Sequence, residues 1–283
     1  MSAQTRTWIP LADLEELART LVVIPTFKNN TLTWDVIKDC LREPVRIVVV
    51  DNSEDYQQIA SETVIRPGRN LGWLRSNNLA IKNALQDGSW NRIVLLNNDV
   101  RLSASFFAGI IWAERYSEAS IVAASYDDIR SVQRPEQLAV GQTLDAHEYN
   151  PEPRNILTGA CDGTAVSIRR DALECIGLFD EERFGKYGWG GIEDLCFRAR
   201  AAGLSIVATR AAYVHHIGGG HQTAKQFIGH PYVELADDEG NSGMSEKWGP
   251  HWRWLTIIPT QAEVNAIFGP GNSEDGKLQR KDR

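Results

Sequence analysis

Ile93-Val94-Leu95-Leu96-Asn97-Asn98-Asp99-Val100 is the stretch that decides the fold class. A short apolar run that ends in polar side chains is typical of a buried strand in a parallel sheet. Ligands of open α/β sheets bind at the carboxyl ends of such strands, so the pattern places Asp99 where a ligand is expected. Asn and Asp also favour turns, and the motif alone leaves an ordinary turn equally open.

The residues around this run alternate between apolar strands and amphipathic helices. We expect strands at 21–24, 45–50, 63–65 and 90–96, and helices at 31–42 and 75–86. Pro25 is expected to stop the first of these strands. The alternation continues to residue 112 and predicts an α/β fold with a doubly wound, mainly parallel central sheet flanked by helices.

The second half of the chain is less regular. A polar, Pro-containing stretch over 125–155 is interpreted as a long surface connection. Further helices are expected at 10–20, 171–176 and 193–202, and further strands at 165–168 and 204–214. The segment from about residue 269 has the composition of a disordered tail.

Composition indicates an ordinary globular protein. The chain has 283 residues, of which 42% are hydrophobic and 24% charged, and its net charge is −7. A net negative charge argues against stable nucleic-acid binding through phosphate contacts. The four cysteines show no metal-binding or disulfide spacing. We identify no signal peptide and no membrane-spanning run, and we expect a cytoplasmic protein, with homo-oligomerisation left open.

Three of the expected strands end in polar residues that suit a nucleotide. Asp51 and Asp99 follow two of the strands, and Thr26 follows the first. Along one edge of a parallel sheet, Thr26 and Asp51 are placed to bind a base or ribose, and Asp99 to hold a cation against a diphosphate. Mg²⁺ and Mn²⁺ are usually held by one or two carboxylates plus substrate phosphates. For Asp51 alone, a helix or turn cap is an equal alternative.

Two clusters in the second half of the chain contain candidate catalytic and metal-binding residues. Glu193 and Asp194 follow a glycine-rich segment at the start of a helix, where one of them can act as a general base. The alternative is helix capping with an ion pair between Asp194 and Arg198. His215-His216 can supply an imidazole ligand to the cation, although an isolated His is more often a core residue.

An ordered series of motifs resembles the GT-A type family 2 glycosyltransferases over residues 21–248. The motifs are Val-Val-Ile-Pro-Thr-Phe (22–27), Val-Val-Val-Asp-Asn-Ser (48–53), Asn-Leu-Gly-Trp with two further amides (70–78), Leu-Leu-Asn-Asn-Asp-Val (95–100), Gly-Leu-Phe-Asp-Glu (177–181), Glu-Asp-Leu-Cys-Phe-Arg (193–198), His-His-Ile-Gly-Gly-Gly (215–220) and Lys-Trp-Gly (247–249). The resemblance implies a Rossmann-like GT-A fold with a C-terminal acceptor-side extension, a nucleotide-diphosphosugar donor, a divalent cation and inversion at the anomeric carbon.

The resemblance also implies roles for individual residues. Asp194, with Glu193 next, would be the base, and Asp99 with His216, or His215 in its place, would meet Mn²⁺ or Mg²⁺. The expected nucleotide-sugar contacts are Pro25, Thr26, Phe27, Asp51, Asn52, Asn70, Gly72, Trp73, Asn77, Asn78, Asn97 and Asn98. The donor implied is a UDP- or dTDP-linked hexose or deoxyhexose, and the acceptor a carbohydrate or another hydroxyl-bearing molecule.

Two positions depart from the family pattern. Asn97 stands where the family's Asp-x-Asp metal motif has its first acid, and in an alignment without a gap Ile192 stands where the base is usual. These departures leave a catalytically silent sugar-nucleotide or carbohydrate-binding domain as one alternative. A sugar-1-phosphate nucleotidyltransferase, which has a related sheet and also binds a nucleotide and Mg²⁺, is the other. The nucleotidyltransferase is less favoured because residues 25–30 lack its glycine-rich loop.

We expect one main domain with extensions. Its parts are a leading helix within 1–20, a nucleotide-sugar half at 21–125, an acceptor and catalytic half at 126–255 and a partly disordered tail at 256–283.

Overall fold

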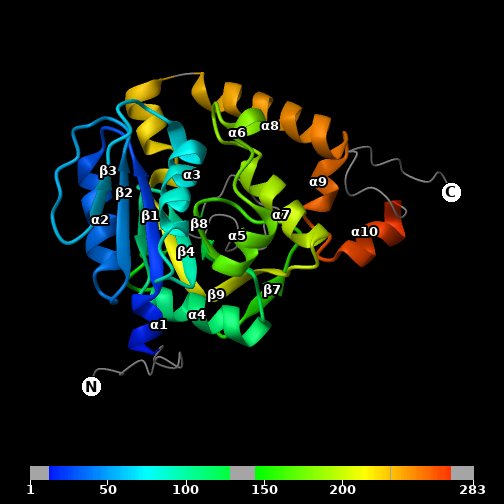
Figure 1. Ribbon diagram of the computed structural model, residues 1–283, viewed down its shortest axis with the longest axis horizontal. Coiled ribbons are helices and arrows are strands. Elements are labelled where there is room, and N and C mark those ends of the chain that lie inside the picture. Colours follow the sequence, from blue (N-terminus) through cyan, green and yellow to red (C-terminus); the bar gives the residue numbers. More distant parts are fainter. Residues whose placement is uncertain (1–12, 128–143, 230, 269–283) are drawn as a thin grey trace.

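A computed structural model describes residues 13–127, 144–229 and 231–268. A single nine-stranded sheet forms its centre, in the order β3-β2-β1-β4-β8-β6-β9-β5, with β7 paired to β9. Helices cover both faces of this sheet (Figure 1). The expectation of an α/β fold with a mainly parallel central sheet is confirmed. The expected tail from residue 269, most of the connection over 125–155 and the start of the leading helix lie outside the described residues.

The first half of the sheet is wholly parallel. Its elements are α1 (Leu14–Ala18), β1 (Thr20–Thr26), α2 (Asn30–Cys40), β2 (Arg46–Asp51), β3 (Thr63–Ile65), α3 (Gly72–Leu85) and β4 (Arg92–Leu96). The expectation that Pro25 ends the first strand is wrong, because Pro25 still pairs with Val50 of β2. Pairing of β1 with β4 already ends at Val23, so no second strand needs an N–H from Pro25.

The second half adds strands of both directions. Its elements are β5 (Val100–Leu102), α4 (Phe106–Ser117), β6 (Ile121–Tyr126), β7 (Asn155–Leu157), β8 (Ala165–Arg169), α5 (Arg170–Ile176), α6 (Glu181–Phe184), α7 (Gly191–Ala201) and β9 (Ile206–His216). β9 is parallel to β6, whereas β8, β5 and β7 are antiparallel to their neighbours. His215 and His216 thus form the last residues of a strand rather than follow it.

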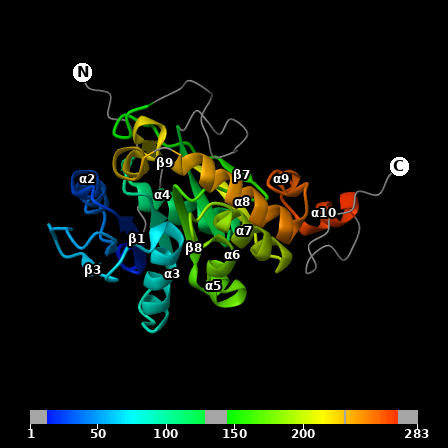
Figure 2. The ribbon, with the colours of Figure 1, turned by 90° about the horizontal axis from the view of Figure 1, so that it is seen from above.

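The described residues after β9 form helices and helical turns, of which α8, with 17 residues, is the longest. They are the turn η1 (Ile217–Gly219), the π-helical turn η2 (Ala224–Ile228), α8 (Tyr232–Trp248), α9 (Trp252–Leu255) and α10 (Gln261–Phe268). From above, α8 crosses the second half of the molecule beside α6 (Figure 2). Among the described residues, no helix is long and apolar enough to cross a membrane.

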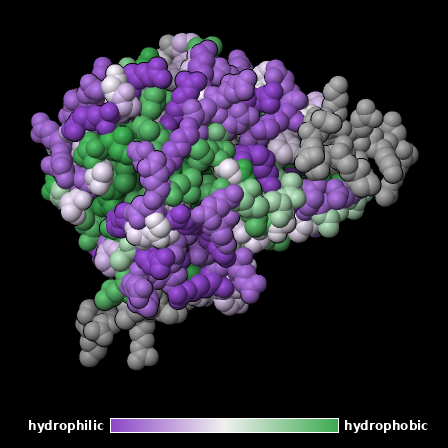
Figure 3. All heavy atoms as spheres, in the orientation of Figure 1, coloured by the Kyte–Doolittle hydropathy of each residue, from purple (hydrophilic) through white to green (hydrophobic). Residues whose placement is uncertain are grey.

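Alternating side chains of the strands build two hydrophobic cores. In β4, Ile93 and Leu95 face the core that includes α3, α5 and α7, while Val94 and Leu96 face the core under α2 and α4. Burial on both faces explains why the strand is apolar at every position. Hydrophobic residues also reach the surface over the part of the molecule where β1–β3 lie next to α3 (Figure 3).

Candidate active site

A cavity of about 980 Å³ opens at the carboxyl ends of β1 and β4. The end of β9, the start of α7 and the first part of α8 complete its wall. The residues predicted for the site that line it are Pro25, Thr26, Phe27, Asn52, Asn70, Gly72, Trp73, Asn97, Asn98, Asp99, Glu193 and His216. The structure therefore brings residues from both halves of the chain into one space.

Asp99 and His216 form a buried pair in this wall. The Nε2 atom of His216 lies 3.3 Å from Oδ1 of Asp99, and the two residues are 3% and 4% exposed. The backbone N–H of Gln222 donates to Oδ2 of Asp99 at 3.0 Å. Burial acts to raise the pKa of the Asp99 carboxyl, but the hydrogen bond and charge of His216, the Gln222 amide and the charge of His221 lower it below the ordinary value overall. Asp99 is therefore an anion in the folded protein.

The loop after β9 holds this pair in place. The Ile217 N–H donates to the carbonyl oxygen of Asp99 at 2.9 Å, which continues the pairing of β5 with β9 by one residue on each side. Gly220 has a φ of 76°, and a Cβ there would lie 2.4 Å from Cε1 of His216. Only glycine allows the loop to approach the imidazole this closely.

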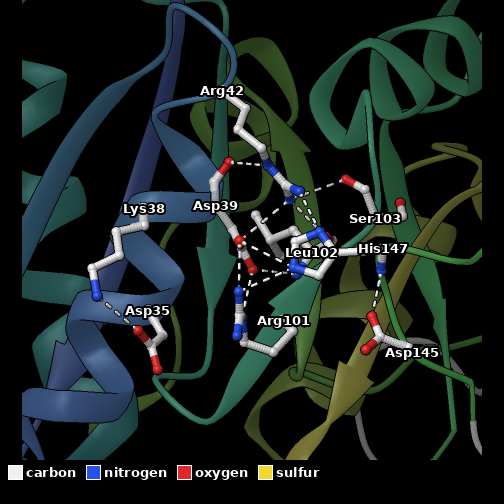
Figure 4. Close-up of polar contacts among 9 residues, drawn as sticks. All are labelled: Asp35, Lys38, Asp39, Arg42, Arg101, Leu102, Ser103, Asp145 and His147. Atoms are coloured by element: carbon white, nitrogen blue, oxygen red, sulfur yellow. Dashed lines mark hydrogen bonds and ion pairs between the residues drawn. The ribbon is translucent and has the colours of Figure 1, made fainter.

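The strand that follows Asp99 is anchored from the opposite side. Arg101 in β5 forms a bidentate ion pair with the buried Asp39 of α2, with N···O distances of 2.7 and 3.0 Å (Figure 4). The backbone N–H of Leu102 also donates to Asp39 at 3.0 Å. His147 lies against Arg101 and Arg42 in the same cluster. These contacts fix the direction in which the chain leaves Asp99.

His215, the second candidate ligand, lies outside the cavity wall that the described residues form. Its Nδ1 atom lies 2.7 Å from Oδ2 of Asp127, and the other oxygen of Asp127 accepts the His216 N–H. Successive residues of a strand point to opposite sides, which explains why only His216 reaches Asp99.

Amides and hydroxyls from the first half of the chain line one side of the cavity, called here the first-half wall. The hydroxyls of Thr26 and Thr33 lie 2.7 Å apart, and the Asn98 amide lies 3.4 Å from Thr26 and 3.3 Å from Thr33. Oδ1 of Asn52 accepts hydrogen bonds from the Leu71 N–H and the Ser76 hydroxyl. These interactions fix the Asn52 and Asn98 side chains before any ligand arrives.

Three residues expected to contact the nucleotide sugar lie outside the wall formed by the described residues. Asp51 forms a turn, because its carboxylate accepts the N–H groups of Ser53 and Tyr56. Asn78 joins α3 to the segment before α6 through two hydrogen bonds with the backbone of Phe179. Asn77 is fully buried within α3. For Asp51, the structure agrees with the turn-cap alternative.

Glu193 and Asp194 separate at the start of α7. Glu193 is 8% exposed and lines the cavity, whereas Asp194 is fully buried behind it. Oδ1 of Asp194 accepts a hydrogen bond from the Trp248 indole and forms an ion pair with the Lys247 ammonium, both at 2.8 Å, and Oδ2 accepts a hydrogen bond from Arg198 at 3.0 Å. Asp194 thus holds α7 against the end of α8. It also forms the ion pair with Arg198 that the sequence offered as the alternative to a catalytic role.

Several wall residues were not identified from the sequence. Asp162 lies in the loop before β8, and the ring of His221 stacks on Trp189 with centroids 5.3 Å apart. His221 has a φ of 57°, a backbone strain that is common at functional sites. The glycine-rich sequence next to His221 is the feature that could have identified it as a site residue. The helix α8 was not expected, because its sequence is rich in Gly, Ser, Asn and Asp.

The metal-binding side chains of the cavity suit a cation that takes part of its ligands from the protein and part from a substrate. Within residues 13–127, 144–229 and 231–268, no group of three or more His, Cys, Asp or Glu side chains could hold a metal ion. Asp99 and His216 supply one carboxylate and one imidazole instead. A site of this kind fits Mn²⁺ or Mg²⁺ when substrate phosphates and water complete the coordination.

Comparison with known proteins gives one family. The profile of Glycosyl transferase family 2 matches residues 21–177. An uncharacterized protein of Mycobacterium tuberculosis is 34% identical over 217 residues, which are 76% of this chain and 80% of that protein. An uncharacterized protein of Mycobacterium bovis matches to the same extent.

Two solved structures share the fold. One is GalNAc-T7 with UDP, GalNAc and Mn²⁺, with a TM-score of 0.54 and 13% identity, covering 84% of this chain and 49% of that one. This chain therefore spans about half of that structure. The other is the mannosyltransferase PcManGT from Pyrobaculum calidifontis in complex with GDP-Man and Mn²⁺, with a TM-score of 0.52 and 12% identity, covering 89% of this chain and 76% of that one. At these identities the likeness concerns the fold alone.

Proposed function

Because the chain belongs to glycosyl transferase family 2, we propose that it transfers a sugar from a nucleotide-diphosphosugar to an acceptor hydroxyl with inversion. The observation that carries this proposal is that one cavity holds the Asp99–His216 pair and Glu193. The pair suits the diphosphate end of a donor, and the carboxylate suits the acceptor end. A UDP- or dTDP-linked hexose or deoxyhexose is the proposed donor, and the cytoplasmic location stays a prediction from the sequence.

The first-half wall would bind the nucleoside. Thr26, Asn52 and Asn70 present hydroxyl and amide groups there, and Phe27 adds an aromatic surface. Hydrogen bonds within the protein already orient Asn52, so little side-chain entropy is lost when a ligand binds. Asp51 is not part of this proposal, because its carboxylate is used in the turn.

Asp99 and His216 would hold Mn²⁺ or Mg²⁺ together with diphosphate oxygens of the donor. When bound, the cation neutralises charge on the departing nucleoside diphosphate. Their burial keeps water away, which strengthens electrostatic interactions at this end of the cavity.

Glu193 is the proposed general base. It takes the proton from the acceptor hydroxyl while that oxygen forms a bond to the anomeric carbon. The bond between the anomeric carbon and the diphosphate oxygen breaks, and the nucleoside diphosphate leaves with the electron pair. A single displacement of this kind inverts the anomeric centre. Asp194 would act as a positioning residue, because it holds α7 against α8.

A donor screen tests the proposal. The protein is incubated with UDP-, dTDP- and GDP-sugars and Mn²⁺, and release of the nucleoside diphosphate is measured with and without candidate acceptors. We expect release from one donor class, accelerated by the correct acceptor and reduced at least about 100-fold in Glu193→Gln. Glu182→Gln removes a charge from the exposed surface of α6 and serves as the control. Donor binding without release in the wild-type protein would favour a silent binding domain instead.

A further inference from the structure

Asp162 lies beside the strand end that carries Asp99. β8 runs antiparallel to β4, with Ala165 opposite Leu96. The Asn97 N–H donates to the carbonyl oxygen of Thr164 at 3.0 Å, which continues this pairing beyond the ladder. Asp162 itself lines the cavity. The loop over 161–164 therefore forms the cavity wall next to residues 97–99.

The same loop contacts α7 on its other side. The Sγ atoms of Cys161 and Cys196 lie 3.7 Å apart, and both residues are fully buried. Cys196 follows Glu193 by less than one turn of the same helix. Asp162 is thus held between the Asp99 end of the cavity and the helix that carries Glu193.

The Asp162 carboxylate has a fixed orientation. Its Oδ1 atom accepts a hydrogen bond from the Thr164 N–H at 2.7 Å and another from the Thr164 hydroxyl. Gly163 packs on Trp73 so closely that a Cβ would lie 3.0 Å from the indole ring. A carboxylate held in this way is ready to accept hydrogen bonds from a ligand without loss of side-chain entropy.

We propose that Asp162 binds hydroxyl groups of the donor sugar and thereby determines which sugars the enzyme accepts. This inference rests on the proposed function, in which the sugar lies between the diphosphate at Asp99 and the base at Glu193. Asn97 at the neighbouring strand end is a neutral amide, so Asp162 adds a second carboxylate to the part of the wall that holds Asp99. Hydrogen bonds from hydroxyls to a carboxylate are stronger than those to a neutral acceptor. A site built for a hydroxyl also rejects sugars that lack it.

Calorimetry with and without the sugar tests this role. Dissociation constants are measured with Mn²⁺ for UDP-glucose against UDP, dTDP-rhamnose against dTDP and GDP-mannose against GDP. For the pair that the wild-type protein binds, Asp162→Asn should raise the dissociation constant of the sugar nucleotide about 10-fold. The dissociation constant of the free nucleoside diphosphate should change less than about 2-fold. The variant keeps an oxygen for the contacts with Thr164, so its melting temperature should stay unchanged. Glu174→Gln, an exposed carboxylate on α5, is the control.

Two results overturn the inference. One is an equal weakening of the sugar nucleotide and the free nucleoside diphosphate in Asp162→Asn, and the other is unchanged binding of both. Failure of the wild-type protein to bind any of the three sugar nucleotides is a different result, because it contradicts the proposed function itself.

Discussion

Val100 of β5 lies opposite His216 of β9, and the Ile217 N–H donates to the carbonyl oxygen of Asp99 at 2.9 Å, so the backbone of Asp99 is held beside the histidine that its side chain contacts. The sheet therefore brings Asp99 and His216 together although they lie far apart in the sequence. Because His216 ends β9 and Asp99 directly precedes β5, the pair is formed before a donor binds.

Asp99→Asn removes the only carboxylate of the Asp99–His216 pair without changing its size. We expect the cation dependence of donor turnover to disappear and kcat/KM to fall by at least about 100-fold, because a neutral amide binds Mn²⁺ or Mg²⁺ poorly. Turnover is measured against Mn²⁺ concentration. Asp171→Asn, an exposed residue in the first turn of α5, is the control. Retained Mn²⁺ activation in Asp99→Asn would contradict the assignment.

Gly220→Ala tests whether the loop must approach the His216 ring. The new Cβ would lie 2.4 Å from the imidazole, so the histidine or the loop has to move. Gly177→Ala is a matched control, since Gly177 has nearly the same φ of 75° and nothing within 4 Å of its added Cβ. Both variants should lose about 1–3 kcal/mol of stability, because a positive φ combined with an extended ψ is a conformation that essentially only glycine adopts. Only Gly220→Ala should also weaken Mn²⁺-dependent nucleotide binding, and equal binding in the two variants would refute this role.

Glu193→Gln and Asp194→Asn should separate chemistry from stability. Glu193→Gln should lose turnover with a nearly unchanged melting temperature, because the residue lies at the cavity surface. Asp194→Asn should lower the free energy of unfolding by about 2 kcal/mol, because it takes the buried anion away from Arg198 and leaves Lys247 with Asp180 as its remaining carboxylate partner. Chemical denaturation and donor turnover are measured on both. A stable but inactive Asp194→Asn protein would instead identify Asp194 as the base.

Glu62 gives a prediction for pH dependence. Burial acts to raise the pKa of its carboxyl, but hydrogen bonds from the Ile59 N–H, the Tyr56 hydroxyl and the Ala60 N–H lower it overall. A carboxyl with a lowered folded-state pKa stabilises the protein above its unfolded pKa of about 4.3, and this contribution disappears as the pH falls through the folded-state pKa.

Glu62→Gln should therefore cost about 1–2 kcal/mol of unfolding free energy at pH 7 and progressively less below about pH 4. Urea denaturation over this pH range measures the difference from the wild-type protein. A difference that is constant with pH would show that the charge of Glu62 does not contribute.

Much of the fold could be predicted from local patterns. β3 was predicted with its correct bounds, and β4 and α7 lie within two residues of their expected starts, because apolar runs and glycine-rich turns mark them. The family and the GT-A fold, predicted from the resemblance, are confirmed by the profile match and the structural neighbours. By contrast, α8 could not be predicted. Its glycines are favourable only because they pack on other segments: Gly240 lies against Trp189, and Gly243 against Phe184.

Some features of the site depend on side-chain directions and strand register, which the sequence motifs do not specify. Strand ends identified Asp99 and Asn52, but they left two roles open for Asp51, whose carboxylate is used in a turn while Asn52 lines the cavity. That difference depends on the direction of one side chain, which motif position does not specify. Asp162 was missed for a related reason, since its place in the wall depends on the antiparallel register of β8 with β4.

Thermal unfolding with nucleoside diphosphates and Mn²⁺ tests the central claim most directly, namely that the Asp99 end of the cavity binds a diphosphate through a cation. At a concentration about 100 times its dissociation constant, UDP, dTDP or GDP should stabilise the protein by about 2.7 kcal/mol, which corresponds to a rise in melting temperature of roughly 5 °C or more. One of these nucleotides should give this rise only when Mn²⁺ or Mg²⁺ is present, and Asp99→Asn should abolish it. A rise of the same size without any divalent cation, or in Asp99→Asn, would contradict this claim.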